Sequence, residues 1–154
     1  MKKIILFSGL LGLSFLFTSC KNDDDSTQSQ YQGELLGKWN LTKKQIILSG
    51  NGKIENYTFN GDCDRKSYVE FTPTWQYLSA IYSANDDNTC KLLNNKVEAF
   101  DFSLNGNHLH INGLEKPSFI AQVNGDILTL KGSRSDKDND GKDEIVILSY
   151  SKVK

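Results

Sequence analysis

The stretch Leu36-Gly37-Lys38-Trp39-Asn40-Leu41 decides the fold of this chain, because it begins the first of many short β-strands. From Trp39 onward, alternate positions give the uneven pattern of a partly exposed strand: Trp39, Leu41, Lys43, Gln45 and Ile47. Gly50-Asn51-Gly52 then forms a hairpin signal, so residues 53–59 are predicted to return as a second strand.

Strand-like runs continue along the rest of the chain, separated by short turns rich in Gly, Asn and Asp. They cover residues 67–72, 74–82, 96–104, 108–111, 118–123, 127–132 and 145–152. Asn105-Gly106-Asn107 and Asn124-Gly125-Asp126 are the clearest turns between them. About eight short strands without a helical period predict an all-β, antiparallel up-and-down meander that forms a barrel or a sandwich.

The Gly37-x-Trp39 opening resembles the first strand of lipocalins and lipocalin-like domains, in which the tryptophan packs across the closed end of the barrel. The order of motifs is also similar to lipocalin-like lipoproteins of Bacteroidetes. The matching pieces are Asp62-Cys63 before an aromatic strand, Phe71, Cys90, Gly106-Asn107 and Leu128-Thr129-Leu130. The resemblance covers residues 35–153 and implies that the meander closes into a lipocalin-like barrel, without naming a ligand.

The first residues have the build of a secretory signal peptide over residues 1–19. Lys2 and Lys3 precede an apolar run over residues 4–17, which is shorter than the roughly 20 residues needed to span a bilayer. Small residues lead to Cys20, which resembles the lipidated cysteine of a lipobox, although Phe17 stands where that motif usually has Leu. The alternative is an ordinary signal peptide followed by a chance cysteine.

Residues 20–34 are polar and lack an apolar pattern, so we expect a flexible tether between the lipidated Cys20 and the folded part. The acidic run Asp23-Asp24-Asp25 resembles the export signal of Bacteroidetes lipoproteins, and its alternative is a solvated linker. This region predicts a protein held by its lipid anchor in the outer membrane, exposed at the cell surface.

Composition supports one folded domain over residues 35–153. A net charge of −1 gives no support to nucleic-acid binding, which usually needs a basic surface. Cys63 and Cys90 remain in the domain, and an oxidising compartment beyond the inner membrane favours a disulfide between them. Two free thiols, or a metal pair lacking further ligands, are the alternatives.

The segment Asp136-Lys137-Asp138-Asn139-Asp140-Gly141 matches the first half of a calcium loop, with carboxylates at positions 1, 3 and 5 and glycine at 6. Position 12 is Ile147 rather than the bidentate glutamate of an EF-hand, and no helix flanks the loop. The sequence predicts a β-hairpin calcium loop whose ligands are Asp136, Asp138, Asp140, Glu144 and the carbonyl of Lys142. The alternative is a solvated hairpin tip, because Asp-Gly favours turns without metal.

No nucleophile elbow, phosphate loop or zinc-protease motif occurs, so we expect a protein that is not an enzyme. His108 and His110 share a strand face that could chelate a metal, but a plain strand surface is the simpler interpretation.

An aromatic group could line a pocket for a small apolar ligand or fill a barrel without a cavity. Its members are Tyr68, Phe71, Trp75, Tyr77 and Tyr82. The sequence therefore predicts a module that binds a small hydrophobic or amphipathic molecule. The alternative is a structural or protein-interaction subunit with a filled barrel, whose protein partner the sequence does not identify.

Overall fold

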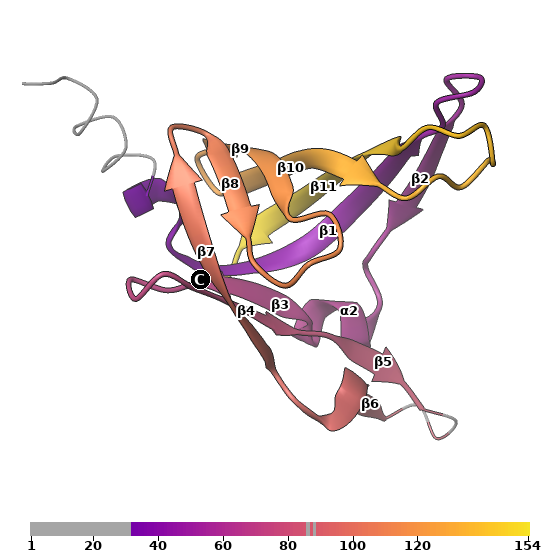
Figure 1. The fold of residues 1–154 in the computed structure, drawn as a ribbon. Helices are drawn as coiled ribbons and strands as arrows, with labels where there is room; N and C mark the ends of the chain where they lie inside the picture. The colour runs from indigo at the N-terminus through magenta and orange to yellow at the C-terminus, as the bar shows by residue number, and fades with distance from the viewer. Residues whose placement is uncertain (1–31, 86, 88) are drawn as a thin grey trace, which may run out of the picture.

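The structure is a computed structural model that describes residues 32–85, 87 and 89–154 (Figure 1). The predicted signal peptide, the lipidated Cys20 and most of the predicted tether lie outside these residues. Residues 32–35 form a helical turn, so the last part of the predicted tether, residues 32–34, belongs to the folded part. Within the described part of the chain, no helix has the length and apolar character needed to cross a membrane.

The described residues are mostly strands joined by short turns, with little helix. The elements are β1 Gly37–Ile47, β2 Ile54–Thr58, α2 Asp62–Lys66, β3 Tyr68–Phe71, β4 Gln76–Ala80, β5 Tyr82–Ala84, β6 Cys90–Leu92, the 3₁₀ turn η1 Leu93–Asn95, β7 Glu98–Asn105, β8 His108–Ile111, β9 Ser118–Asn124, β10 Ile127–Arg134 and β11 Glu144–Lys152. The predicted strands are all present within a few residues. The segment expected to be one strand over residues 74–82 divides into β4 and β5.

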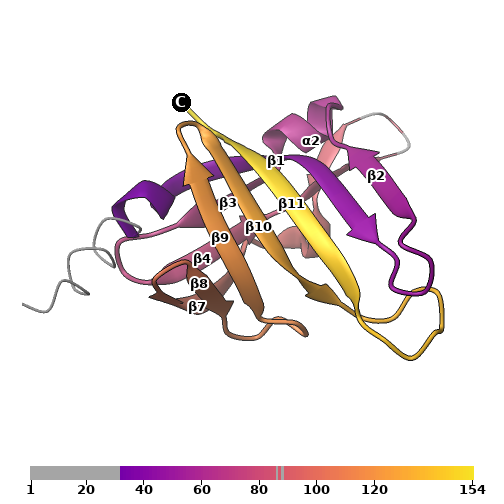
Figure 2. The ribbon, with the colours of Figure 1, turned by 90° about the horizontal axis from the view of Figure 1, so that it is seen from above.

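Eight of the strands form one closed antiparallel barrel in the order β11-β10-β9-β8-β7-β4-β3-β1, because β11 also pairs with β1. Figure 2 shows β9, β10, β11 and β1 side by side on one wall of the barrel. The closure confirms the predicted all-β meander and selects a barrel over a sandwich. A barrel of about eight strands has an interior just wide enough for side chains to fill it.

Strand β1 is long because its two halves pair with different strands on the same edge. Its first residues, Gly37 to Trp39, pair with β3, whereas Lys43 to Ile47 pair with β2. Strand β2 therefore leaves the barrel and, together with the tips of β1, β10 and β11, builds an arm that extends to the upper right of Figure 1. We call this part, residues 43–58 and 131–147, the long arm.

A register shift in the pairing of β1 with β11, between Leu41 and Lys43, changes which side chains of β1 face inward. Beyond it, Lys44 and Ile46 lie opposite Leu148 and Val146 of β11, and Ile46 is only 1% exposed. The alternation predicted from Trp39 through Lys43 to Ile47 is therefore wrong after the bulge.

The core fills the barrel from the end where the described chain begins. The Trp39 side chain is 0% exposed, and its indole Nε1 donates a 2.8 Å hydrogen bond to the carbonyl of Leu35 in the helical turn. This places Trp39 across the closed end of the barrel, as the resemblance implied. The core cluster is Leu35, Trp39, Val69, Phe71, Tyr77, Phe102, Leu104, Leu109, Ile111, Ala121, Leu128, Leu130 and Tyr150.

Candidate functional site

The predicted aromatic group does not form one pocket, because its five members lie in different places. Phe71 and Tyr77 are core residues, and their ring centroids lie 5.3 Å apart. Phe102 packs edge-on against Phe71 at 5.2 Å and also contacts Trp75, which is 36% exposed in the turn between β3 and β4. Phe71, Tyr77 and Phe102 therefore pack together in the interior, and Trp75 lies at its edge.

The other two predicted pocket residues are directed elsewhere. Tyr68 is on the outer face of β3, where the Nζ atom of Lys38 lies 4.4 Å from its ring centroid. Tyr82 is in β5, beside the disulfide. The reason is the alternation of β3, in which Val69 and Phe71 are buried and the residues between them face outward.

Two tyrosine side chains are enclosed in the core. Burial raises the pKa of Tyr77 from its ordinary value of 10.0 to about 12, and burial also raises the pKa of Tyr150. The folded state therefore disfavours both phenolates. The enclosed phenols mark the interior as a place that excludes water and charge.

Alkaline unfolding tests this enclosure. Because the pKa of Tyr77 is higher in the folded state, its contribution to stability is intact below pH 10 and is lost as the pH rises toward about 12. We expect the unfolding free energy of Tyr77→Phe to fall less steeply over this interval than that of the wild type, measured by urea unfolding at several pH values. The exposed substitution Tyr57→Phe is the control, and a wild-type slope in Tyr77→Phe would contradict the prediction.

The barrel has a mouth at the end away from Trp39, where apolar side chains on the core are only partly buried. Phe119 lies over Gly132, where an added Cβ would be 2.7 Å from its ring, and Phe100 lies equally close to Gly113. Leu148 and Leu114 are also partly buried against the core. These residues give the mouth an apolar floor above the filled interior.

Basic side chains project from the inner face of the long arm beside this floor. Lys44 of β1 pairs with Leu148 of β11, and Arg134 of β10 pairs with Glu144 of β11. Both partners belong to the set of alternate β11 residues that faces inward, so Lys44 and Arg134 lie on the inner face as well. Partial burial and the positive charges of Arg134 and Lys137 lower the pKa of Lys44. Among the described residues, neither Lys44 nor Arg134 takes part in an ion pair, whereas Lys137 pairs with Glu55.

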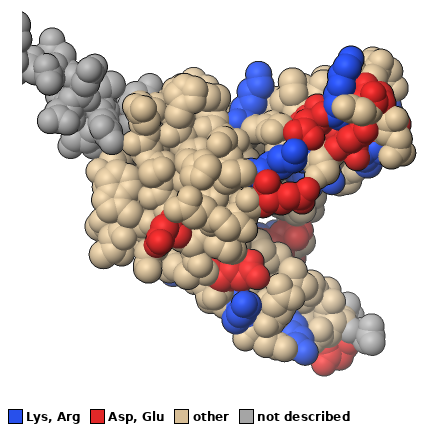
Figure 3. All heavy atoms as spheres, in the orientation of Figure 1, with Lys and Arg blue, Asp and Glu red and all other residues tan. Residues whose placement is uncertain are grey.

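The space-filling view shows a notch at the mouth end of the molecule (Figure 3). One side of the notch is the long arm, on which Lys, Arg, Asp and Glu side chains gather, and the other is the part that carries β5 and β6. The face that covers β7 to β9 is nearly free of charged side chains. The charged surface seen in this view is therefore concentrated on the long arm and along the notch.

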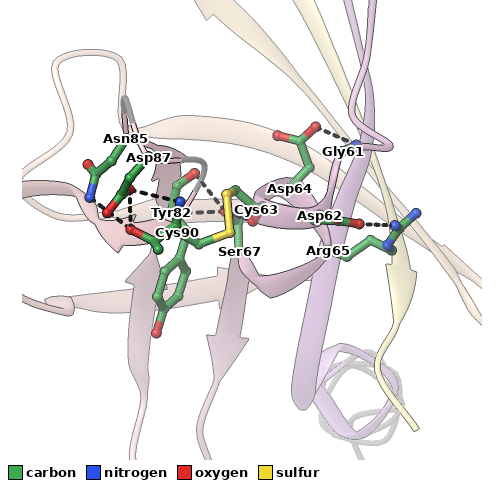
Figure 4. The surroundings of a disulfide bond; sticks show 11 residues. Gly61, Asp62, Cys63, Asp64, Arg65, Ser67, Tyr82, Asn85, Asp87 and Cys90 are labelled. Carbon is green, nitrogen blue, oxygen red and sulfur yellow. Dashed lines mark hydrogen bonds and ion pairs between the residues drawn. A yellow bond between two sulfur atoms is a disulfide. The ribbon is translucent and has the colours of Figure 1, made fainter.

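The predicted disulfide between Cys63 and Cys90 is present and joins α2 to β6 (Figure 4). The buried Ser67 continues this connection, because its Oγ accepts a 2.8 Å hydrogen bond from the Tyr82 amide and donates to the carbonyl of Cys63. A hollow of about 580 Å³ lies between α2 and β5. Sequence reasoning missed this hollow, since α2 and β5 are too short to show a period.

The acidic loop between β10 and β11 brings together part of the predicted calcium set. Asp136, Asp138 and Glu144 each offer a carboxylate oxygen within 4.8 Å of the others. Asp140 is not part of this group, because its carboxylate accepts hydrogen bonds of 2.9 Å from the Ser49 hydroxyl and from the Lys142 amide. The carbonyl of Lys142 stays a predicted ligand.

His108 and His110 lie on the outer face of β8 and border a shallow hollow of about 170 Å³. The Nδ1 atom of His110 lies 3.1 Å from the Ser118 hydroxyl. Neither histidine belongs to a group of metal-ligating side chains found among the described residues.

A family model described as a lipocalin-like domain matches residues 35–151 of the chain. The chain therefore belongs to the lipocalin-like domain family, whose barrel is generally used for binding and transport.

One solved structure similar to the chain is the siderocalin Ex-FABP, reported to function through dual ligand specificities. The similarity has a TM-score of 0.44 at 12% sequence identity, and it covers 78% of this chain and 74% of that chain. No curated protein matches the chain.

Proposed function

We propose that this lipocalin-like domain binds a small amphipathic molecule that carries an anionic group, and that the site is the mouth of the barrel. One observation supports this most: strand register places Lys44 opposite the partly buried Leu148, and Arg134 two residues beyond Gly132, which lies opposite the partly buried Phe119. Neither cation forms an ion pair among the described residues, and the Lys44 ammonium lies 5.9 Å from the Tyr57 ring centroid. The floor would bury the apolar part of the ligand, and the cations would attract its anionic group. The packed interior favours the mouth over a deeper site.

We also propose that the protein is a lipoprotein of the Bacteroidetes type, exported by residues 1–19 and anchored through Cys20 in the outer membrane at the cell surface. The described chain enters the barrel at the closed end, through residues 32–35 (Figure 1). An anchor on this side would leave the mouth directed away from the lipid. Mass spectrometry of the protein from its host membrane tests the anchor, because a diacylated N-terminal cysteine has a distinct mass.

A fluorescent fatty acid tests the proposed site. We expect cis-parinaric acid to bind the purified protein and its methyl ester to bind less tightly, because the ester lacks the negative charge. Lys44→Gln is expected to weaken binding of the acid by about three- to tenfold, which corresponds to one charged contact. Fluorescence titration provides both affinities.

Lys43→Gln is the matched control, since this neighbouring lysine is exposed on the opposite face of β1. Equal losses in the two variants, or no binding of either probe to the wild type, would contradict a site at the mouth.

The second candidate function is a structural or protein-interaction subunit. The filled interior and the nearly uncharged face over β7 to β9 support it (Figure 3). A photo-cross-linker placed at Ile120, which is exposed on β9, would then capture one defined partner in the native membrane, while both fluorescent probes fail to bind. Catalysis is not part of either proposal.

A further inference from the structure

We propose that the β10–β11 loop binds a calcium ion through Asp136, Asp138 and Glu144, and that the ion fastens this loop to the tip between β1 and β2. This inference is independent of what the mouth of the barrel binds. It concerns the far end of the long arm, where two hairpins that are remote in sequence meet (Figure 1).

Glu144 is the fully buried member of the group. Its side chain is 0% exposed, and its carboxylate accepts a 2.7 Å hydrogen bond from the Ser49 amide and a 3.1 Å bond from the Lys137 amide. Burial of an ionised carboxylate is costly unless hydrogen bonds or a cation compensate its charge. Two backbone amides leave several lone pairs of this carboxylate open to a cation.

Asp138 carries the observation that points most directly to a missing ligand. Its Oδ2 accepts from the Gly50 amide at 3.2 Å, but its Oδ1 is shielded from solvent and has no hydrogen-bond partner. A shielded carboxylate oxygen without a partner is rare in folded proteins, because no hydrogen bond offsets the free energy lost on removing it from water. A calcium ion shared with Asp136 and Glu144 would supply that partner.

Backbone amides donate to the carboxylates of the group, those of Asn139 and Gly141 to Asp136, but no basic side chain balances its charge. None of its three carboxylates forms an ion pair with a described residue, and Lys137 within the loop pairs with Glu55 instead. The three carboxylates each place an oxygen within 4.8 Å of the others, and like charges at this separation repel one another. A divalent cation resolves the repulsion among all three at neutral pH.

The ligand type selects calcium among divalent cations. Calcium takes about six to eight oxygens at roughly 2.4 Å in a flexible arrangement, whereas magnesium requires near-octahedral geometry and keeps its waters. The group offers carboxylate oxygens without the thiolate or imidazole ligands that structural zinc sites use, so its ligand set favours calcium over zinc. Asp140 follows in the same loop but stands beside the group, where its Oδ1 accepts hydrogen bonds from the Ser49 hydroxyl and the Lys142 amide.

The contact between the two tips explains what the ion would do. An added Cβ at Gly50 would lie 2.9 Å from the Asp138 carboxylate, so a larger residue at this position would push the carboxylate out of its present place. Ser49 bonds both Glu144 and Asp140. A bound ion would hold these carboxylates in place and thereby stiffen the long arm.

Calcium titration of the purified protein, followed by isothermal calorimetry and by thermal unfolding, tests the proposal. We expect 10 mM calcium to raise the Tm of the wild type by about 5 °C, given a dissociation constant of roughly 0.1–1 mM, and 10 mM magnesium to have a smaller effect. Asp138→Asn is expected to weaken calcium binding at least tenfold. Without calcium this variant should unfold no earlier than the wild type, because it loses a repulsive charge.

Asp143→Asn is the control, since Asp143 lies in the same loop but pairs with Lys116 at 2.7 Å outside the group. This variant is expected to keep the full calcium response. No heat and no change of Tm in the wild type at 10 mM calcium would overturn the proposal. An equal loss of response in Asp143→Asn would overturn the assignment of the ligands.

Discussion

Replacing Trp39 with alanine is expected to lower the free energy of unfolding by about 3–5 kcal/mol. Trp39 is 0% exposed at the closed end of the barrel, so its removal leaves a large cavity in a part of the core that cannot collapse easily. The change also removes the hydrogen bond from the indole to the Leu35 carbonyl, which holds the helical turn against the barrel. A typical domain has only about 5–15 kcal/mol of stability, so the variant should be close to unfolding at 37 °C.

Urea unfolding followed by circular dichroism measures this effect, with Trp75→Ala as the control. Trp75 is of the same residue type but 36% exposed, so its replacement by alanine should lower the free energy of unfolding much less than Trp39→Ala does. Comparable losses in the two variants would show that the closed end is not the part of the core on which the barrel depends. Trp39→Phe should recover part of the loss by refilling the cavity, although it cannot restore the hydrogen bond.

The second large effect is expected from the disulfide. The double variant Cys63→Ser/Cys90→Ser should lose about 3–4 kcal/mol, because a cross-link between residues 27 apart restricts the unfolded chain. The cross-linked segment contains β3, β4 and β5, so its loss would also loosen the connection of α2 to β6. Urea unfolding of the two proteins gives the difference in free energy.

A reducing agent provides the matched control for the same claim. Dithiothreitol should lower the unfolding midpoint of the wild type toward that of the double variant and leave the double variant unchanged. An unaltered midpoint in both comparisons would mean that α2, β5 and β6 are held by Ser67 and the surrounding packing alone.

Much of the barrel could be predicted because the sequence marks its turns. Gly106 and Gly125 adopt positive φ angles of 57° and 59° in the predicted hairpin turns, where residues without a Cβ are favoured. The bulge in β1 could not be predicted, since a shift of one residue leaves no composition signal. The five-residue α2 and the three-residue strands β5 and β6 are held by the disulfide and Ser67 rather than by a pattern.

The sequence predicted the parts of the candidate sites that depend on local spacing, but not the parts that depend on tertiary contacts. The grouping of Asp136, Asp138 and Glu144 follows from local spacing, so the sequence contained it. The contact of this loop with Ser49 and Gly50 depends on tertiary structure and was not predicted. The basic side of the mouth was missed as well, because the bulge decides that Lys44, rather than Lys43, faces inward.

The seam between β1 and β11 has a consequence for how the chain is made. The hydroxyl of Thr42 bonds the carbonyl of Ser149, 107 residues further along, so the barrel closes only after its last strand is available. Contacts of such long sequence separation form late and slowly during folding. A chain interrupted before Glu144 would expose the edges of both β1 and β10, and such edges recruit other chains into aggregates. Synthesis of the complete chain therefore precedes closure of the barrel, and until β11 pairs with β1 the two edges remain open to other chains.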